Sequence, residues 1–283
     1  MNTPEEALSS RDFARLRSFI YAEAGISLSA EKKTMLEARL KRRLRALELA
    51  SYRDYCEYLL GEEGLRTEKV PFLDVVTTNK TDFFREAGHF SFLEQRALPE
   101  MQARIAGARP ALVWSAGCSS GEEPYTLAMV LGEYAEAHPG FRFGILATDL
   151  STRMLEQARL GVYRAEDVEP VPLALRRKYL LRSREKGSDR VRVAPALRQA
   201  VEFRRLNFMD AEYGLAEKAD AIFCRNVMIY FDRPTQEKIL GRLCRYLEPG
   251  GYLFVGHSES LHEMRLPLEV VGPALYRRTR VER

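Results

Sequence analysis

Apolar residues recur every three or four positions in the first part of the chain, which is the spacing of amphipathic helices. One stripe falls within residues 13–20 and a second within residues 36–47. Ser51 followed by Asp54 has the three-residue spacing of a helix N-terminal cap, so a third helix is expected there. The pattern predicts an all-α domain, with its linker, over residues 1–72.

The hydrophobic pattern changes after a polar break at residues 61–64, and a domain boundary is expected between that break and Val76. Short, continuous apolar runs then alternate with helical stretches. The runs are residues 112–114, 144–147, 221–224 and 252–255, and the clearest helical stretches are residues 124–137 and 235–247. Because apolar strands separated by helices indicate a mostly parallel sheet covered on both faces, we predict an α/β domain over residues 73–283.

One stretch interrupts this alternation. Leu180-Leu181 and Val191-Arg192-Val193 lie on either side of a turn-like segment, Lys186–Asp189. They predict an antiparallel hairpin, inserted as a small β-subdomain over about residues 172–200. Residues 201–203 are expected to rejoin the main sheet.

The composition indicates which class of protein this chain belongs to. The 283 residues are 46% hydrophobic, which is enough for two cores. No apolar run approaches the roughly 20 residues that span a bilayer, and the opening residues lack the basic and then apolar order of a secretory signal. The four cysteines are far apart and form no CxxC pair, so neither a zinc site nor a disulfide framework is indicated. We expect a cytoplasmic protein with reduced cysteines, no metal and no membrane insertion.

The net charge of +4 is small but unevenly distributed. Basic residues are concentrated in residues 32–45 and 176–205, which favours acidic partner surfaces over nucleic acid. Lys41, Arg42 and Arg45 project away from the leucine stripe of the second helix. This basic face is either simply solvated or the contact surface for an acidic partner.

A turn of small residues joins the first parallel strand to its helix. The strand ends at Trp114, and the segment Ser115–Gly121, which includes Gly117, leads into a helix from Glu122. At the carboxyl edge of an open α/β sheet, small residues let a ligand approach the backbone closely. A plain tight connection has the same composition, so the turn alone leaves both interpretations open.

Acidic residues narrow the choice of ligand. Asp149 ends the second strand, where a carboxylate can accept hydrogen bonds from both hydroxyls of a ribose; alternatively it only caps the helix that starts near Ser151. Glu122 and Glu123 open the first helix, where they repel a pyrophosphate but can pair with a cationic amine or sulfonium. The combination favours S-adenosylmethionine over NAD.

Polar and aromatic residues also follow the strand at residues 221–224, namely Arg225, Asn226 and Tyr230. Ligands bind outside the carboxyl ends of parallel strands, so these side chains suit a substrate-facing site beside the cofactor.

Several runs of sequence resemble the CheR family of chemotaxis receptor methyltransferases. They are Thr77–Glu86, Trp114–Gly117 with Gly121–Tyr125, Ile222–Phe231 and Gly256–Ser260, and the likeness covers nearly the whole chain from about Val75. Two positions depart from the pattern. Ser119 stands where many class I methyltransferases keep glycine, and the inserted hairpin is poor in glycine. The second departure argues against the docking of a receptor's C-terminal peptide at the β-subdomain, which some family members show.

The resemblance implies a class I, Rossmann-like methyltransferase fold with a small inserted β-subdomain, preceded by an all-α domain that helps to recognise the receptor. It implies methyl transfer from S-adenosylmethionine to the γ-carboxylate of receptor glutamates for sensory adaptation, with S-adenosylhomocysteine as the second product. The cofactor contacts that it implies are Asn79, Thr81, Arg85, Glu123, Asp149, Leu206, Asn207, Arg225 and Asn226.

A glutamate side chain with a pKa near ~4.3 is already a nucleophile at neutral pH, so no general base is expected. As candidates for catalysis we single out Arg85, which would orient the substrate or the cofactor's carboxylate, and Tyr230, which with Arg225 would shape the acceptor pocket. Two alternatives stay open: a methyltransferase for another substrate, such as RNA or a small molecule, and a catalytically silent adaptor that binds S-adenosylmethionine or its product.

Overall fold

The computed structural model describes residues 7–185 and 187–279. Residues 1–6, Lys186 and residues 280–283 lie outside the described part, and with them the first position of the predicted turn at Lys186–Asp189. Within the described ranges, no helix is both long enough and apolar enough to pass through a bilayer. The four cysteines all fall in these ranges, where each is buried and unpaired with another cysteine.

The first domain is all helix, as predicted. Its helices are α1 (Ser10–Ala24), η1 (Ala30–Lys32), α2 (Lys33–Ala46), α3 (Tyr52–Leu60), α4 (Glu62–Thr67) and α5 (Lys69–Val76). Both predicted stripes are buried, with Leu16, Ile20 and Leu36 fully inaccessible to solvent. The predicted cap is confirmed, because the Ser51 hydroxyl accepts from the backbone N–H of Asp54 at 3.1 Å.

The predicted polar break at residues 61–64 is only one residue wide. Gly61 separates α3 from α4, and α4 contains Glu62, Glu63 and Gly64. A Cβ on Gly64 would lie 2.0 Å from the carbonyl oxygen of Tyr58, so this glycine lets α4 fold back against the end of α3. Glu62 and Glu63 therefore begin the helix α4 instead of forming a loop, which their polarity alone does not predict.

The second domain is built on a seven-stranded sheet. Its strands are β1 (Ala111–Ala116), β2 (Phe143–Asp149), β6 (Val201–Arg205), β7 (Ala219–Cys224), β8 (Leu247–Val255), β9 (Leu268–Gly272) and β10 (Leu275–Arg278), in the order β6-β2-β1-β7-β8-β10-β9. The neighbouring pairs from β6 to β8 are parallel, and β10 is antiparallel to β8 and β9. This arrangement confirms the predicted mostly parallel sheet and the class I methyltransferase fold.

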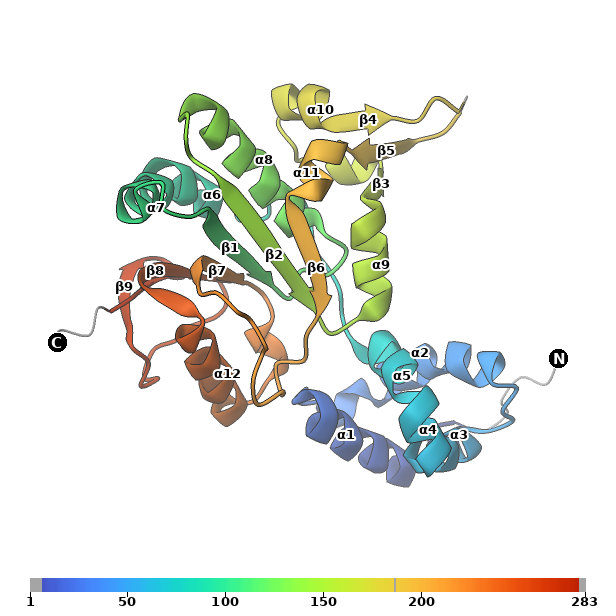
Figure 1. The fold of residues 1–283 in the computed structure, drawn as a ribbon. Coiled ribbons are helices and arrows are strands. Elements are labelled where there is room, and N and C mark those ends of the chain that lie inside the picture. The colour runs from blue at the N-terminus through green and yellow to red at the C-terminus, as the bar shows by residue number, and fades with distance from the viewer. Residues whose placement is uncertain (1–6, 186, 280–283) are drawn as a thin grey trace.

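Helices cover both faces of this sheet (Figure 1). They are α6 (Gly88–Phe92), which continues through a π-helical turn (Leu93–Ala97) into α7 (Leu98–Ile105), α8 (Glu122–Ala137), α9 (Thr152–Leu160) and α12 (Arg233–Arg245). Successive residues of a strand point to opposite faces of the sheet and pack in different hydrophobic cores. Val113 and Phe223 belong to the core with α7 and α8, whereas Trp114 and Ile222 belong to the core with α12. This is the two-faced burial that the continuous apolar runs predicted.

A small antiparallel sheet is inserted between β2 and β6. It has the order β3-β5-β4 and consists of β3 (Val162–Arg164), β4 (Leu180–Arg182) and β5 (Arg190–Val193), accompanied by η3 (Glu166–Val168), α10 (Leu173–Tyr179) and α11 (Pro195–Gln199). The predicted β4–β5 hairpin and the return of β6 to the main sheet are confirmed. The third strand, β3, precedes the range predicted for this subdomain. Figure 1 shows the small sheet on the far side of α9 from the helical domain.

The helical domain lies across the carboxyl edge of the main sheet, where β2 and β6 end (Figure 1). Polar contacts join the two domains there. The Asp74 carboxylate accepts from the backbone N–H of Thr152 at 2.8 Å and from its hydroxyl at 2.6 Å. The Asn207 amide donates to the carbonyl oxygen of Glu23 at 2.6 Å. The edge that binds ligands in open α/β folds is therefore roofed by the first domain.

Candidate active site

A cavity of about 360 Å³ lies between the helical domain and the carboxyl edge of the sheet. It contains every residue predicted for the site except Leu206. The predicted residues that line it are Asn79, Thr81, Arg85, Gly117, Glu123, Asp149, Asn207, Arg225, Asn226 and Tyr230. Leu206 is instead packed in the core with α12, and its backbone N–H donates to the carbonyl oxygen of Asp149 at 3.0 Å.

The turn after β1 is held in a left-handed conformation. Gly117, Ser119 and Gly121 have φ angles of 91°, 49° and 101°. A Cβ on Gly117 would lie 2.5 Å from Cγ2 of Val227, so only glycine lets the loop after β7 pack on this turn. Ser119 adopts the left-handed conformation without glycine, and its hydroxyl donates to the carbonyl oxygen of Asn79 at 3.0 Å. The departure from the glycine pattern thus ties the turn to the segment after α5.

Asp149 joins two turns at the end of β2. One carboxylate oxygen accepts from the backbone N–H of Ser119 at 2.8 Å and the other from that of Ser151 at 2.9 Å. Ser151, rather than Asp149, caps α9, because its hydroxyl accepts from the backbone N–H of Met154. Burial raises the pKa of Asp149, although the N–H groups of Ser151 and Ser119 oppose the shift. The simple capping interpretation is therefore wrong, and the carboxylate faces the cavity.

Arg225 stands between two carboxylates. Its guanidinium lies 3.1 Å from the Glu86 carboxylate and 3.4 Å from that of Glu123. Glu123 also accepts from the Ser115 hydroxyl at 2.7 Å. Only 2% of the Arg225 side chain and 13% of each carboxylate side chain are exposed, so solvent screens these charges weakly. With two carboxylates and one guanidinium, this cluster carries one net negative charge when both acids are ionised.

The two acids of this cluster shift in opposite directions. Burial acts to raise the pKa of Glu86, but the charge of Arg225 and the N–H of His257 outweigh it and hold that pKa below its ordinary value. For Glu123 burial is the stronger effect and raises the pKa, against Arg225 and the Ser115 hydroxyl. The guanidinium is closer to Glu86 than to Glu123, so it opposes the effect of burial more strongly at Glu86.

Arg85 and Tyr230 face the same cavity from different elements. Arg85 precedes α6, and its side chain donates to the carbonyl oxygen of Lys80 at 3.2 Å. Tyr230 ends the 3-10 helix η4 (Met228–Tyr230). Burial raises the pKa of Tyr230, while the positive charges of Arg85 and Arg39 oppose the shift.

The helical domain contributes residues to the cavity that the sequence did not reveal. They are Ala24, Ile26, Ser27, Leu28, Ser29, Lys32 and Met35, and the other domain adds Phe90 and Phe208. The backbone N–H of Ser27 donates to the carbonyl oxygen of Tyr230 at 2.8 Å. These contacts join parts of the chain some 200 positions apart, and a single sequence carries no periodicity that signals them.

A second missed group is Glu259. Its buried carboxylate accepts from the backbone N–H groups of Asn226 at 2.8 Å and Met228 at 2.7 Å. The run Gly256–Ser260 is part of the family resemblance, but the resemblance implied no role for Glu259. The signal for it is only the acidic residue itself within an otherwise small, polar turn.

One group of side chains has the composition of a metal site. Ligand atoms of Glu86, His89 and His257 lie within 4.8 Å of one another. The Glu86 carboxylate is already paired with Arg225, and a cation placed beside a guanidinium is repelled. Burial, and then Arg225, lowers the pKa of His89 to about 4, so this histidine is neutral at pH 7. The expectation that the protein needs no metal stays a prediction.

The cavity combines an acid at a strand end, the cluster around Arg225, the Tyr230 phenol and the Arg85 guanidinium. A carboxylate at the end of the second strand can bind a ribose, and the anionic cluster can attract a cationic ligand. Within this cavity the predicted site residues therefore form one continuous surface that is suited to a charged nucleoside.

Comparison with known proteins agrees with this chemistry. Residues 79–275 match the family model "CheR methyltransferase, SAM binding domain", and residues 11–77 match "CheR methyltransferase, all-alpha domain". Chemotaxis protein methyltransferase 2 of Pseudomonas aeruginosa is 41% identical over 266 residues, which are 94% of this chain and 92% of that protein. The chemotaxis protein methyltransferase of Klebsiella aerogenes is 41% identical over 95% of this chain and 90% of its own length. That of Borreliella burgdorferi is 38% identical over 94% of both chains. The chain therefore belongs to the CheR family of chemotaxis methyltransferases.

Proposed function

We propose that this methyltransferase transfers the methyl group of S-adenosylmethionine to the γ-carboxylate of glutamate residues on chemoreceptors. The products are a glutamate methyl ester and S-adenosylhomocysteine. The observation that carries the proposal is the roofed cavity at the carboxyl edge of the sheet, which is lined by Asp149, Glu123, Arg85 and Tyr230.

Each of these residues has a role that its surroundings support. Asp149 accepts hydrogen bonds from the ribose hydroxyls, since each of its oxygens has a further lone pair beyond its backbone N–H partner. Glu123 attracts the cationic end of the methionine part. Asn79, Thr81, Asn207, Arg225 and Asn226 complete the binding surface, and Leu206 acts through the backbone of Asp149.

The reaction needs little proton chemistry. A carboxylate oxygen of the substrate attacks the methyl carbon, the carbon–sulfur bond breaks, and its electron pair passes to sulfur. A carboxylate and a sulfonium become two uncharged groups, so a dry site with the reacting atoms held about 3 to 3.5 Å apart supplies much of the rate. No general base is required, because the acceptor is ionised at neutral pH.

The same argument limits Arg85. A tight ion pair with the attacking oxygen would stabilise the ground state more than the transition state. We therefore assign Arg85 to orienting the substrate or the cofactor's carboxylate, and Tyr230 to shaping the acceptor pocket with Arg225.

The direct test is labelling. The protein is incubated with radiolabelled S-adenosylmethionine and a receptor cytoplasmic fragment, and the label is then tested for release by base as expected for a methyl ester. A fragment in which the acceptor glutamates are replaced by alanine is the matched control. Cofactor binding without any label transfer would indicate the silent adaptor, and transfer only to RNA or a small molecule would indicate another substrate.

The receptor contact is part of the proposal. Lys41, Arg42 and Arg45 are all exposed on α2, and none lies within 4.0 Å of a carboxylate in the part of the chain that the structure describes. Their charge suits the acidic, glutamate-bearing helices of a receptor. The glycine-poor β-subdomain gives no comparable reason to propose that it docks a receptor's C-terminal peptide. Location in the cytoplasm stays a prediction.

A further inference from the structure

Glu259 is a buried acid that the proposed reaction does not use. It is 7% exposed and lies in the turn after β8. One carboxylate oxygen accepts from the backbone N–H groups of Gly256 at 2.6 Å and Asn226 at 2.8 Å. The other accepts from those of Met228 at 2.7 Å and Ile229 at 3.4 Å. Among residues 7–185 and 187–279, no basic side chain lies within 4.0 Å, so the carboxylate interacts with backbone N–H groups.

The segment that it holds is conformationally demanding. Asn226 has a φ of 58°, in the left-handed region that non-glycine residues rarely adopt. Met228 and Ile229 begin the 3-10 helix η4, where backbone N–H groups have no partner within the helix. A single carboxylate therefore stabilises both the unusual residue and the start of the helix that follows it.

The two turns also fit closely together. A Cβ on Gly256 would lie 2.9 Å from the backbone nitrogen of Asn226 and 2.9 Å from the Glu259 carboxylate. No larger residue fits there, so the turn after β8 is shaped to present Glu259 to the loop after β7.

That loop forms one wall of the cavity. Asn226, Val227, Ile229 and Tyr230 all line it, whereas Glu259 does not. Val227 packs against the glycine turn at Gly117. Glu259 accepts hydrogen bonds from Asn226 on the cofactor side and from the first two residues of η4, the short helix that ends at Tyr230 on the acceptor side.

We propose that Glu259 is a positioning residue for methyl transfer: it fixes the loop Asn226–Tyr230 so that the side chains at its two ends face the cofactor and the acceptor carboxylate. The inference rests on the proposed function. It goes beyond that function because Glu259, which does not line the cavity, would determine how the reacting groups are aligned.

The test is Glu259→Gln, which keeps the shape but turns one oxygen into an NH₂ group that cannot accept the N–H bonds on its side. The concentration of competent protein is first measured by titration with S-adenosylhomocysteine. Per competent molecule, we expect kcat/KM for the receptor fragment to fall about 10- to 100-fold, mostly in kcat, because the reacting groups are misaligned. The affinity for S-adenosylhomocysteine should change less than about five-fold, since Gly117, Glu123 and Asp149 are untouched.

Asp220→Asn is the matched control. Asp220 is also a fully buried acid, bonded to Arg104, Arg109 and the N–H of Leu112, but near the start of β7, at the opposite edge of the sheet. It should lower stability while kcat and KM per competent molecule stay within about two-fold. If Glu259→Gln does not fold, Glu259→Asp, which keeps the charge on a shorter side chain, is measured with the same expectation.

The outcomes are distinct. Unchanged kinetic constants per competent molecule in the Glu259 variant would overturn the inference, as would an equal kinetic loss in Asp220→Asn. A wild-type protein that leaves no base-labile methyl ester would contradict the proposed function instead.

Discussion

Single carboxylates do much of the structural work at this site, and Asp149 is the clearest example. It connects the turn after β1 to the start of α9 through Ser119 and Ser151. Its position at a strand end was predictable from the sequence. Its double attachment was not, because Ser119 is 30 positions away and comes close only through the parallel pairing of β1 and β2.

Asp149→Ala should weaken the binding of S-adenosylhomocysteine by about 2 kcal/mol, roughly a 30-fold rise in Kd, because two hydroxyl acceptors are lost. Titration calorimetry measures this directly. Glu156→Ala removes an exposed carboxylate from nearby α9 and should leave Kd unchanged. Equal affinities of wild type and Asp149→Ala would refute the ribose contact.

Glu122 offers a test by pH. Burial raises the pKa of this acid to about 7, against the Ser120 hydroxyl. Because the folded state then binds more protons than the unfolded state between about pH 4.5 and pH 7, this acid makes the protein less stable as pH rises through that window. Glu122→Gln removes the effect, so its stability relative to wild type should be about 2 kcal/mol greater at pH 8 than at pH 5.

Urea unfolding at the two pH values measures this difference. Glu156→Gln, on an exposed position, should show no such pH-dependent gain. A constant difference between Glu122→Gln and wild type at pH 5 and pH 8 would show that Glu122 titrates normally.

Among the elements, the sequence predicted those with a strong pattern. The continuous apolar strands β1, β2, β7 and β8 and the amphipathic helices α1, α2 and α8 all form where expected. The strands β3, β9 and β10 were missed. β3 is only three residues long, and β9 has no buried residue although it contains Leu268, Val270 and Val271, so neither shows the pattern of a buried strand.

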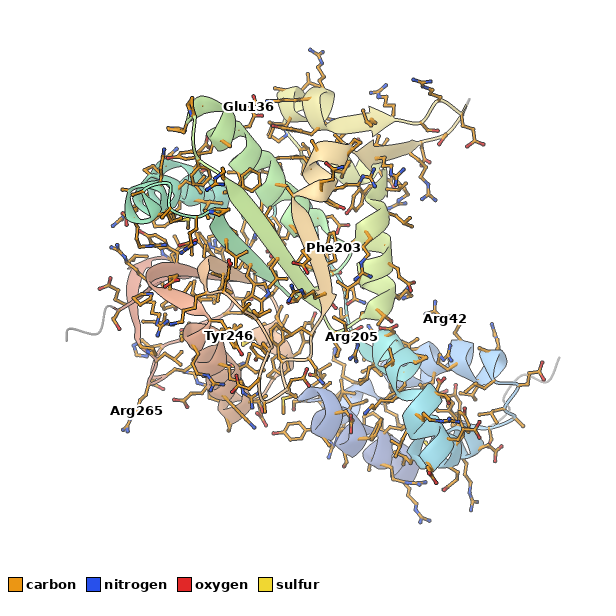
Figure 2. All side chains as sticks on the ribbon, in the orientation of Figure 1. Arg42, Glu136, Phe203, Arg205, Tyr246 and Arg265 are labelled. Carbon is orange, nitrogen blue, oxygen red and sulfur yellow. The ribbon has the colours of Figure 1, made fainter. Side chains whose placement is uncertain are left out.

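The basic helix α2 is one wall of a second, open cavity, whose other wall is α9. Arg42 from α2 and Arg153 from α9 both line it, and Arg42 projects on the side of its helix nearest α9 (Figure 2). Thr77, Thr78 and Asn79 line this cavity and the cofactor cavity alike. An acidic helix held by α2 would therefore lie next to the segment that leads to the cofactor.

Reversing charge at this groove should slow receptor methylation. We expect Arg42→Glu and Arg153→Glu each to lower kcat/KM for the receptor fragment about five-fold at low salt, and less at high salt, because screening acts over roughly 8 Å. Lys238→Glu on α12 changes the net charge equally at an exposed position away from the groove. A similar loss in Lys238→Glu, or no dependence on salt, would remove the case for this contact.

Considered as a whole molecule, the protein is organised around the contact between its two domains. The helical domain lines the cavity with residues from Ala24 to Met35 and is joined to the sheet through Asp74 and Asn207. Sequence periodicity identified both domains separately. It could not place one on the other, because the joining groups are isolated polar residues without a repeating pattern.

Ligand binding should therefore stabilise both domains together. S-adenosylhomocysteine at about 100 times its Kd adds roughly 2.7 kcal/mol of stability, and hydrogen exchange should slow in Ile26–Ser29 as well as around Gly117 and Asp149. The α10–β4 region, outside the cavity, serves as the internal control. Protection confined to the sheet edge would show that the helical domain does not close over the ligand.

The arginine held between Glu86 and Glu123 has a consequence for turnover. With both acids ionised the cluster carries one excess negative charge, and in the proposed reaction the cofactor's sulfonium is bound opposite it. Methyl transfer turns that sulfonium into a neutral thioether, so the part of the attraction that is due to the sulfonium is lost in the same step. We expect S-adenosylhomocysteine to dissociate faster than S-adenosylmethionine. Raised salt should reduce the difference between their two affinities.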